Sequence, residues 1–238
     1  MRIQTVAHLW RYSRLACYHL SSLLLAPPTV KVQVTIYRAD CDAQAAAACL
    51  FFGPRLRDVG VDLDEQVRSR ELVCRRGILR NEAAKHTTAD WVWFCDIDTV
   101  FGPGCVDTLP PLLAGVPADC PLVYPEAVWA TTQDAGDRLI NALDGPTVAE
   151  VPIAGLQRMG YSKAIGGAQI VRGDVARAKG YCPDHKRAQR PAINWVRTHE
   201  DVHFRRLLGT DGVPIPLANL LRIRHTRRGG HGSQEVHL

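Results

Sequence analysis

The sequence lacks several patterns that would assign a protein to a class at once. None of its eight cysteines forms a Cys-x-x-Cys pair, so a zinc site is not indicated. No apolar run reaches the ~18 residues that a membrane-spanning helix requires. Internal repeats and low-complexity tracts are also missing. These absences leave an ordinary globular chain, whose function must be inferred from short motifs and their order.

The cysteines and the N-terminal segment indicate a compartment. Several cysteines lie in apolar runs and have the character of small buried hydrophobic residues, which suits a reducing environment. The stretch Leu20 to Ala26 is short, starts late and is interrupted by Ser21 and Ser22, unlike a signal peptide. We therefore expect a cytoplasmic protein.

The overall composition sets the size and charge of the molecule. A chain of 238 residues with 46% hydrophobic residues is long enough for one sizeable domain with a full core. The net charge of +5 fits an anionic ligand but is too small to indicate nucleic acid, which we do not expect as a partner.

Apolar spacing divides the first hundred residues into alternating strands and helices. The strands are expected at 3–9, 30–37 and 71–74, and the helices at 12–25, 42–52 and 77–85. Asp42 is a candidate N-cap, and the polar stretch 58–69 is expected to be a loop or a sheet edge. This alternation predicts an α/β, Rossmann-like fold: a mostly parallel sheet with helices on both faces.

The stretch 91–101 is the centre of this pattern. Five apolar residues run into Asp96 and Asp98, and an apolar pair and a Gly-Pro-Gly turn follow. The run predicts a strand buried on both faces, and period-two alternation would point the two carboxylates to the same side. The carboxyl end of such a strand is where α/β sheets bind ligands. Paired carboxylates repel each other and favour a cation such as Mg²⁺ or Mn²⁺, although a solvated acidic turn is the alternative.

The chain after residue 102 is richer in proline and glycine. Further strands are expected at 151–156 and 168–172, and a helix from Glu200 to Leu208. The basic tail 222–238 is expected to be flexible. We predict a single domain over 1–238, with a first half 1–101, a second half 102–221 and this tail.

Several short motifs occur in a particular order along the chain. They are Arg80-Asn81, Asp96 with Asp98, Gly166-Gly167-Ala168, Glu200-Asp201 and an isolated His225. In this order they resemble the nucleotide-sugar glycosyltransferases of the GT-A fold, family 2 in particular, with an Asp-x-Asp motif. The resemblance covers roughly Ile3 to His225. It implies that the first half binds the nucleotide-sugar and the second half binds the acceptor.

The resemblance implies a metal site. Asp98 would ligate the ion, Asp96 would reach the ribose or the metal, and His225 would supply an imidazole, with His231 as its rival. An imidazole ligand favours Mn²⁺ over Mg²⁺. The cation would neutralise the departing nucleoside diphosphate, UDP being the expected nucleotide.

The resemblance also implies residues that bind the donor. Arg80 would pair with Asp96 or a phosphate, and Arg75 and Arg76 either serve the same pocket or are inert surface charges. Other donor-binding candidates lie at strand ends, in the glycine pair and in the tail: His8, Arg11, Tyr37, Gly167 and Arg224. The turn His8–Arg11 and the segment Tyr37–Asp40 depart from the family pattern.

Glu200-Asp201 is the candidate for the catalytic base. Transfer with inversion needs a carboxylate that deprotonates the acceptor, and the resemblance assigns this to Asp201, with Glu200 orienting it or touching the acceptor. Plain capping of the helix is the alternative. Sugar-stacking faces could come from Trp129, Trp195 and Tyr161, although such aromatic residues are more often part of a core.

Other functions remain open at this point. The motif from Asp96 also fits a haloacid-dehalogenase-like Mg²⁺-dependent phosphatase with a nucleophilic aspartate, although no later Asp-Asp pair follows. A nucleotidyltransferase would show a Gly-rich basic loop after the first strand, where Trp10-Arg11-Tyr12 stands instead. A catalytically inactive sugar-nucleotide-binding module is the non-enzymatic alternative. The acceptor, whether glycan, lipid, peptide or small molecule, is not indicated, and the basic tail permits peripheral membrane contact.

Overall fold

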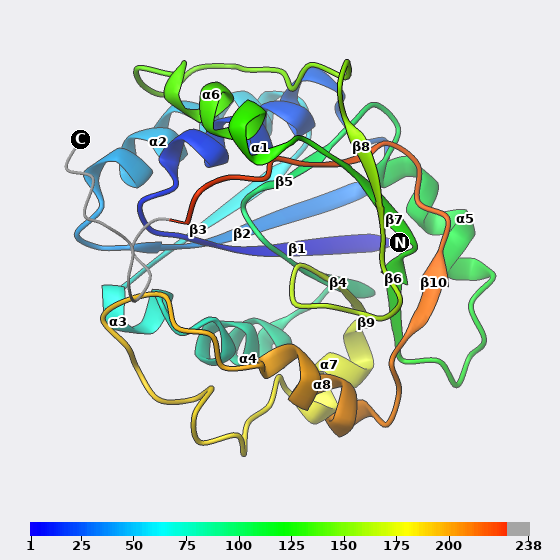
Figure 1. Cartoon of the computed structure of the whole chain (residues 1–238). Coiled ribbons are helices and arrows are strands. Elements are labelled where there is room, and N and C mark those ends of the chain that lie inside the picture. The colour runs from blue at the N-terminus through cyan, green and yellow to red at the C-terminus, as the bar shows by residue number, and fades with distance from the viewer. Residues whose placement is uncertain (228–238) are drawn as a thin grey trace.

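The computed structural model describes residues 1–227, which are organised around two β-sheets (Figure 1). The larger sheet has seven strands in the spatial order β10 (Val213–Ile215), β6 (Leu122–Pro125), β9 (Ala168–Arg172), β4 (Trp91–Cys95), β1 (Arg2–Leu9), β2 (Lys31–Ala39) and β3 (Asp62–Arg68). The pairs β1–β2, β1–β4, β2–β3 and β6–β10 are parallel, and β9 is antiparallel to both neighbours. The predicted mostly parallel sheet is confirmed.

The central strands are buried because apolar side chains fill both of their faces. All five residues of β4 are buried, and so are seven of the eight in β1, where only Arg2 is partly exposed. Trp93 of β4 packs edge-on against Phe101, with ring centroids 5.3 Å apart. A strand with no solvated face has one fixed register, and its polar residues can reach solvent only at its ends.

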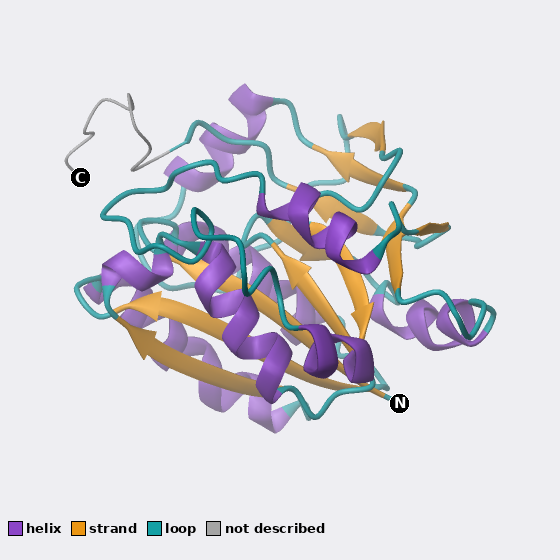
Figure 2. Ribbon diagram, turned by 90° about the horizontal axis from the view of Figure 1, so that it is seen from below, coloured by secondary structure: helices purple, strands orange, loops and turns teal. Residues whose placement is uncertain are grey.

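Helices cover both faces of the larger sheet, as predicted (Figures 1 and 2). One side carries α1 (Ser13–Leu25), α2 (Ala43–Asp58) and α6 (Gln133–Asn141), and the other carries α3 (Arg70–Val73), α4 (Arg76–His86), α7 (Gly173–Lys179) and α8 (Glu200–Leu208). A 3₁₀ turn at Val106–Thr108 leads into α5 (Leu109–Ala114). Asp42 caps α2 as predicted, because its side chain accepts a hydrogen bond from Ala45 N.

The smaller sheet determines what surrounds Asp98. Its four strands are ordered β5 (Thr99–Phe101), β11 (Leu220–Arg222), β7 (Ala127–Ala130) and β8 (Gln157–Gly160). In the antiparallel β5–β11 pair, Arg222 lies opposite Thr99. The first strand of this sheet follows Asp98 directly, so the sheet brings a late segment of the chain against the end of β4.

Three local predictions were wrong. The segment 71–74 forms no strand, since residues 71–73 belong to the short helix α3. The third parallel strand is β3, a half-buried strand at the edge of the sheet, which confirms the sheet-edge alternative predicted for 58–69. No strand forms at 151–156; β8 begins at Gln157. Helix α2 continues beyond residue 52 to Asp58, through Pro54. In each case contacts with distant parts of the chain outweigh the local apolar pattern.

Two whole-chain properties bear on localisation. All eight cysteines are free thiols, and all but Cys41 and Cys120 are buried. Among residues 1–227, no helix combines the length and the apolar character that crossing a membrane would need.

Candidate active site

Asp96 and Asp98 lie in a turn rather than on the strand from which the alternation argument started. Strand β4 ends at Cys95, and Thr99 N donates a hydrogen bond to Asp96 O over 3.0 Å. Both aspartates nevertheless line one pocket, together with Gly167, Tyr161 and Arg222 among others. The turn and the smaller sheet, rather than strand alternation, bring the two carboxylates to this pocket.

Asp98 is the most deeply enclosed carboxylate of the pocket, with 6% of the residue exposed. Arg222 Nε donates to Asp98 Oδ2 over 2.9 Å, and His225 Nε2 lies 3.9 Å from the same oxygen. The other oxygen, Oδ1, is buried without a hydrogen-bond partner among the described residues. Burial raises the pKa of Asp98 above its ordinary value, and Asp96 raises it further, although Arg222 and His225 oppose this.

Asp96 is held by two guanidinium groups from α4. Arg76 Nη1 lies 2.8 Å and Arg80 Nη2 3.4 Å from Asp96 Oδ1. Burial raises the pKa of Asp96, but Arg76 and Arg80 outweigh it and hold this pKa well below its usual range. The two aspartates therefore differ, since Arg76 and Arg80 favour the ionised form of Asp96 whereas burial disfavours the ionised form of Asp98. The predicted pairing of Arg80 with Asp96 is confirmed by this contact.

Arg76 also bridges to the start of α8. Its Nη2 lies 3.0 Å from Glu200 Oε1, while Thr198 Oγ1 donates to Glu200 Oε2. Glu200 is only 3% exposed. Burial acts to raise the pKa of Glu200, but Arg76 and Arg80 prevail and lower it to about 2. Glu200 is thus a fully paired, permanently charged side chain that fixes the position of α8.

Asp201 is the more accessible carboxylate at the start of α8. Its side chain is 25% exposed and lies 3.3 Å from Arg205 Nη1. A β-carbon added to Gly166 would lie 3.8 Å from Asp201 Cβ and 3.9 Å from Arg80 Nη1. The backbone of the glycine pair therefore lies between Asp201 and the arginine that binds Asp96.

A buried hydrogen-bonded chain connects Asp96 to Asp201. Arg80 Nη1 donates to Tyr181 Oη over 3.1 Å, and Tyr181 Oη donates to Gln169 Oε1 over 2.7 Å. Gln169 Nε2 in turn donates to the Asp201 carbonyl over 3.4 Å. Arg80, Tyr181 and Gln169 have no exposed surface, so this chain is a rigid support.

The residues predicted at the ends of β1 and β2 fall into two groups. His8 is buried and stacks on Tyr37 with ring centroids 5.7 Å apart, and neither ring nitrogen of His8 has a hydrogen-bond partner in the described part of the chain. Burial, with help from Arg80, lowers the pKa of His8 well below its ordinary value. Arg11 is exposed and lies over the Trp10 ring, 4.8 Å from the ring centroid.

The three predicted tail residues, Arg224, His225 and His231, have different outcomes. His225 lies near Asp98, whereas the exposed Arg224 is held by its backbone, since its N–H donates to Thr131 Oγ1. His231, the rival ligand, lies outside the described residues. Arg224 remains a prediction as a donor-binding residue.

The three candidate aromatic residues lie in different places. Tyr161 lines the pocket of the two aspartates. Trp195 contacts Trp10 and Tyr12, with ring centroids 6.1 and 6.3 Å away, and Tyr12 also contacts His225 at 5.0 Å. Trp129 is exposed on β7. Tyr161 is thus the aromatic residue of the three at the carboxylates.

The pocket fits a divalent cation only in part. In favour are the unpartnered Asp98 Oδ1, the nearby His225 imidazole and Asp96 Oδ2, which faces Gly167. Such a set of oxygen and nitrogen ligands suits Mn²⁺. Within residues 1–227, however, no three His, Cys, Asp or Glu side chains are grouped as a metal site, and a guanidinium group holds one oxygen of each aspartate.

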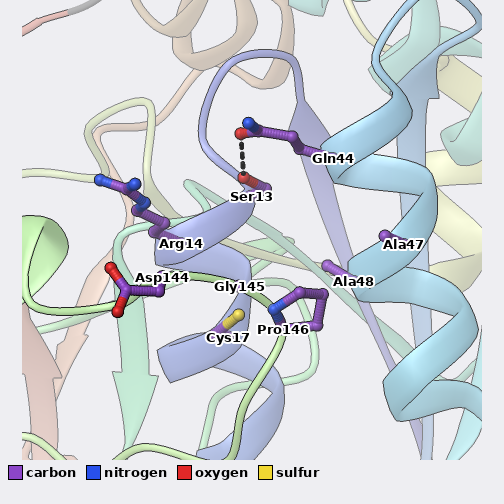
Figure 3. Close-up of a pocket in the computed structure, with 9 residues that line it drawn as sticks. All are labelled: Ser13, Arg14, Cys17, Gln44, Ala47, Ala48, Asp144, Gly145 and Pro146. Atoms are coloured by element: carbon purple, nitrogen blue, oxygen red, sulfur yellow. Dashed lines mark hydrogen bonds between the residues drawn. The ribbon is translucent and has the colours of Figure 1, made fainter. Parts of the chain in front are cut away.

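A larger cavity of about 140 Å³ lies elsewhere, between α1, α2 and the loop after α6 (Figure 3). Cys17, Ala47, Ala48 and Pro146 form its apolar part, and Ser13 donates to Gln44 at its rim. Asp144 is the one carboxylate among the residues that line it, and burial raises the pKa of the Cys17 thiol. The chemistry therefore favours the smaller pocket at Asp98.

Arg76 and Arg222 are the residues whose roles the sequence concealed. Arg76 was one of two arginines expected to be either useful or inert. Arg222 was not singled out at all, and the one local signal for it is a cation at the end of the apolar run 220–221. Both act on carboxylates far along the chain, and only the tertiary fold brings them together.

No protein-family model and no curated protein matches the sequence. Among solved structures, the mannosyltransferase PcManGT from Pyrobaculum calidifontis, in complex with GDP-Man and Mn²⁺, matches over 93% of this chain with a TM-score of 0.56 and 13% identity. The fold is that of the GT-A glycosyltransferases. The glycosyltransferase GlyE from Streptococcus pneumoniae TIGR4 matches 90% of this chain with a TM-score of 0.50 and 13% identity.

The chain spans about half the length of these two solved structures, 56% of PcManGT and 44% of GlyE. At this identity the likeness shows the fold alone. The predicted fold class is thereby confirmed, whereas the donor, the metal and the residue roles rest on the geometry of the pocket.

Proposed function

We propose that this chain is a metal-dependent glycosyltransferase that moves a sugar from a nucleotide-sugar to an acceptor. One observation carries the proposal: a buried carboxylate, Asp98, lies beside Asp96 just after the central strand of a GT-A fold, and its Oδ1 has no partner within residues 1–227. A buried, unpartnered carboxylate oxygen is costly, so this position favours a ligand.

The metal would be held by Asp98, Asp96 and His225. Bound there, Mn²⁺ or Mg²⁺ would supply positive charge to the leaving diphosphate. The chain contributes further positive charge from Arg76, Arg80 and Arg222, which already converge on the two aspartates. This concentration of cations suits a diphosphate.

We assign the nucleoside end of the donor to the ends of β1 and β2. There His8 and Tyr37 form a stacked pair, with Arg11 nearby, and the buried ring nitrogens of His8 have no partner in the described chain. Gly167 gives the donor close access to Asp96, and Arg224 is assigned to the donor phosphates. UDP is the first choice of nucleotide, and GDP is the alternative because the PcManGT complex contains GDP-Man.

Asp201 is the proposed base of an inverting transfer. It is accessible and sits beside the glycine pair, whereas Glu200 is enclosed and paired with Arg76. A base must be reachable by the acceptor hydroxyl, which favours Asp201. Glu200 is then a positioning residue that acts through Arg76.

The phosphatase alternative has weaker support. It needs Asp96 as a free nucleophile, whereas Arg76 and Arg80 hold Asp96 Oδ1. An inactive sugar-nucleotide-binding module would use the same pocket, and it differs from the enzyme only in turnover.

The test is binding followed by turnover. Thermal unfolding is measured with Mn²⁺, UDP and GDP, alone and combined, and UDP- and GDP-sugars are then screened for nucleotide release. A nucleotide at 100 times its Kd should stabilise the protein by about 2.7 kcal/mol. Asp98→Asn should abolish the part of this stabilisation that depends on Mn²⁺.

Asp119→Asn is the matched control, since Asp119 is exposed on a different turn. Stabilisation by phosphate mimics with Mg²⁺, but not by nucleotides, would favour the phosphatase. Stabilisation by nucleotide without release from any sugar donor would favour the inactive module. The same response in Asp98→Asn as in the wild type would contradict the proposed site.

A further inference from the structure

Arg222 holds Asp98 Oδ2, which is the oxygen that His225 approaches and therefore the one that a metal shared by Asp98 and His225 would use. Its Nε donates to Asp98 Oδ2 over 2.9 Å, and Tyr161 lines the same pocket as this guanidinium. The backbone on either side is fixed as well, because β11 pairs with β5 and Ile223 N donates to Asp98 O over 2.9 Å. The guanidinium can therefore leave Asp98 only by rotation of its own side chain.

The ion pair has an electrostatic reason. Asp98 is enclosed and lies near a second carboxylate, and Arg76 and Arg80 are engaged with Asp96. A buried carboxylate anion with no partner is strongly unfavourable, so the ionised form of Asp98 needs a cation beside it. In this structure that cation is Arg222.

We propose that Arg222 is an exchangeable counter-ion of Asp98, which a divalent metal displaces, and that the displaced guanidinium then binds the diphosphate of the donor. The proposal rests on the proposed transferase function. It adds Arg222 to the residues that bind the donor. It also means that the metal and the Arg222 guanidinium compete for Asp98 Oδ2.

Three features support the exchange. Among the described residues, Asp98 Oδ1 has no hydrogen-bond partner even while Arg222 holds Oδ2, so the carboxylate has capacity for a second cation. His225, three residues after Arg222, already lies 3.9 Å from Asp98 Oδ2. Arg222 also lines the pocket together with Asp96 and Gly167, so its released guanidinium stays within reach of a bound phosphate.

The test measures Mn²⁺ affinity without nucleotide, by electron paramagnetic resonance of free Mn²⁺, for the wild type, Arg222→Gln and Arg222→Lys. Arg222→Gln removes the competing charge and should bind Mn²⁺ about tenfold or more tightly than the wild type. Arg222→Lys keeps a cation and should stay close to the wild type. Without metal, Arg222→Gln should melt at a lower temperature than the wild type, and Mn²⁺ should restore it.

Arg158→Gln is the matched control, because it removes the same charge from β8, where Arg158 pairs with Glu126 away from the aspartates. It should leave Mn²⁺ affinity unchanged. Equal or weaker Mn²⁺ binding by Arg222→Gln, or no Mn²⁺ binding by any of the proteins, would overturn the exchange. If Arg222→Gln binds Mn²⁺ more tightly but the wild type consumes no nucleotide-sugar, the exchange stands and the transferase function fails.

Discussion

Gly167 lies directly against the carboxylate of Asp96. A β-carbon at position 167 would stand 2.8 Å from Asp96 Oδ2 and 3.1 Å from its Cγ. Trp93 Nε1 donates to the Gly167 carbonyl over 3.4 Å, so the glycine backbone cannot easily retreat. The missing side chain at 167 therefore keeps one oxygen of Asp96 open to the pocket.

We predict that Gly167→Ala abolishes Mn²⁺-dependent nucleotide binding while the protein still folds. The new methyl group must push the Asp96 carboxylate aside, which disturbs its pairing with Arg76 and Arg80. Gly166→Ala is the control, because its methyl group would meet nothing nearer than 3.8 Å. Binding is measured by calorimetry, and equal loss in both variants would contradict the specific role of Gly167.

We predict that Asp201→Asn lowers turnover by about 10²- to 10⁴-fold, the usual contribution of a general base. Mn²⁺ and nucleotide affinity should change little, because Asp201 is assigned to the acceptor. Initial rates and nucleotide calorimetry on the same preparation check this. Full turnover by Asp201→Asn would show that another group takes the proton.

In contrast to Asp201→Asn, we predict that Glu200→Gln lowers the stability of the protein more than its turnover. Loss of the Glu200 charge leaves Arg76 with one carboxylate instead of two, and we expect the free energy of unfolding to fall by about 1–3 kcal/mol. Denaturant unfolding at pH 7 measures this. A stable Glu200→Gln variant without turnover would transfer the role of base from Asp201 to Glu200.

Because Tyr181 links Asp96 to Asp201 through buried hydrogen bonds, we predict that removing its hydroxyl lowers the stability of the protein. Tyr181→Phe leaves Arg80 Nη1 and Gln169 Oε1 without this partner in a region with no exposed surface. We expect the free energy of unfolding to fall by about 1–3 kcal/mol. Tyr124→Phe, a buried tyrosine outside this chain, is the control, and an equal loss there would show a nonspecific effect.

His19 predicts a pH dependence of stability. It is fully buried on α1, its Nδ1 lies 2.7 Å from Thr99 O, and burial lowers its pKa from 6.5 to about 4 although this contact opposes the shift. The unfolded chain takes up a proton below pH 6.5 that the folded chain refuses until pH 4. Stability is therefore complete above pH 6.5 and is lost progressively between these values.

The measurement compares the wild type with His19→Gln. Between pH 7.5 and pH 5, the wild type should lose about 2 kcal/mol more of its unfolding free energy than the variant. Denaturant titrations at both pH values give the two differences. Identical pH dependence in the two proteins would contradict a depressed His19 pKa.

Local patterns in the sequence were sufficient for the elements that carry the site. The apolar run 91–95 could be nothing but a buried strand, and the helix over Glu200–Leu208 was predicted with the bounds that the structure gives. Asp42 correctly predicted the N-terminus of α2 as its N-cap residue. These features depend on side-chain periodicity and capping, which act over a few residues and can therefore be inferred from them.

Short stretches of the sequence could not predict which charged side chains pair in the site. Asp98 and Arg222 are 124 residues apart, and Asp96 and Arg76 meet because α4 packs against β1, the strand next to β4 in the sheet. The sequence nominated both Glu200 and Asp201 as catalytic, but burial separated a paired, enclosed carboxylate from an accessible one. Burial and pairing are properties of the assembled fold, because the free energy of a charge depends on everything around it.

The sequence alone thus determined where the carboxylates, the glycine pair and the late histidine stand along an α/β chain. Tertiary structure decided which cation each carboxylate receives, which of them remains open to a ligand, and that the third strand lies at 62–68 rather than 71–74. The physical reason is range: periodicity is a short-range property, whereas ion pairing and desolvation depend on segments that only folding brings together.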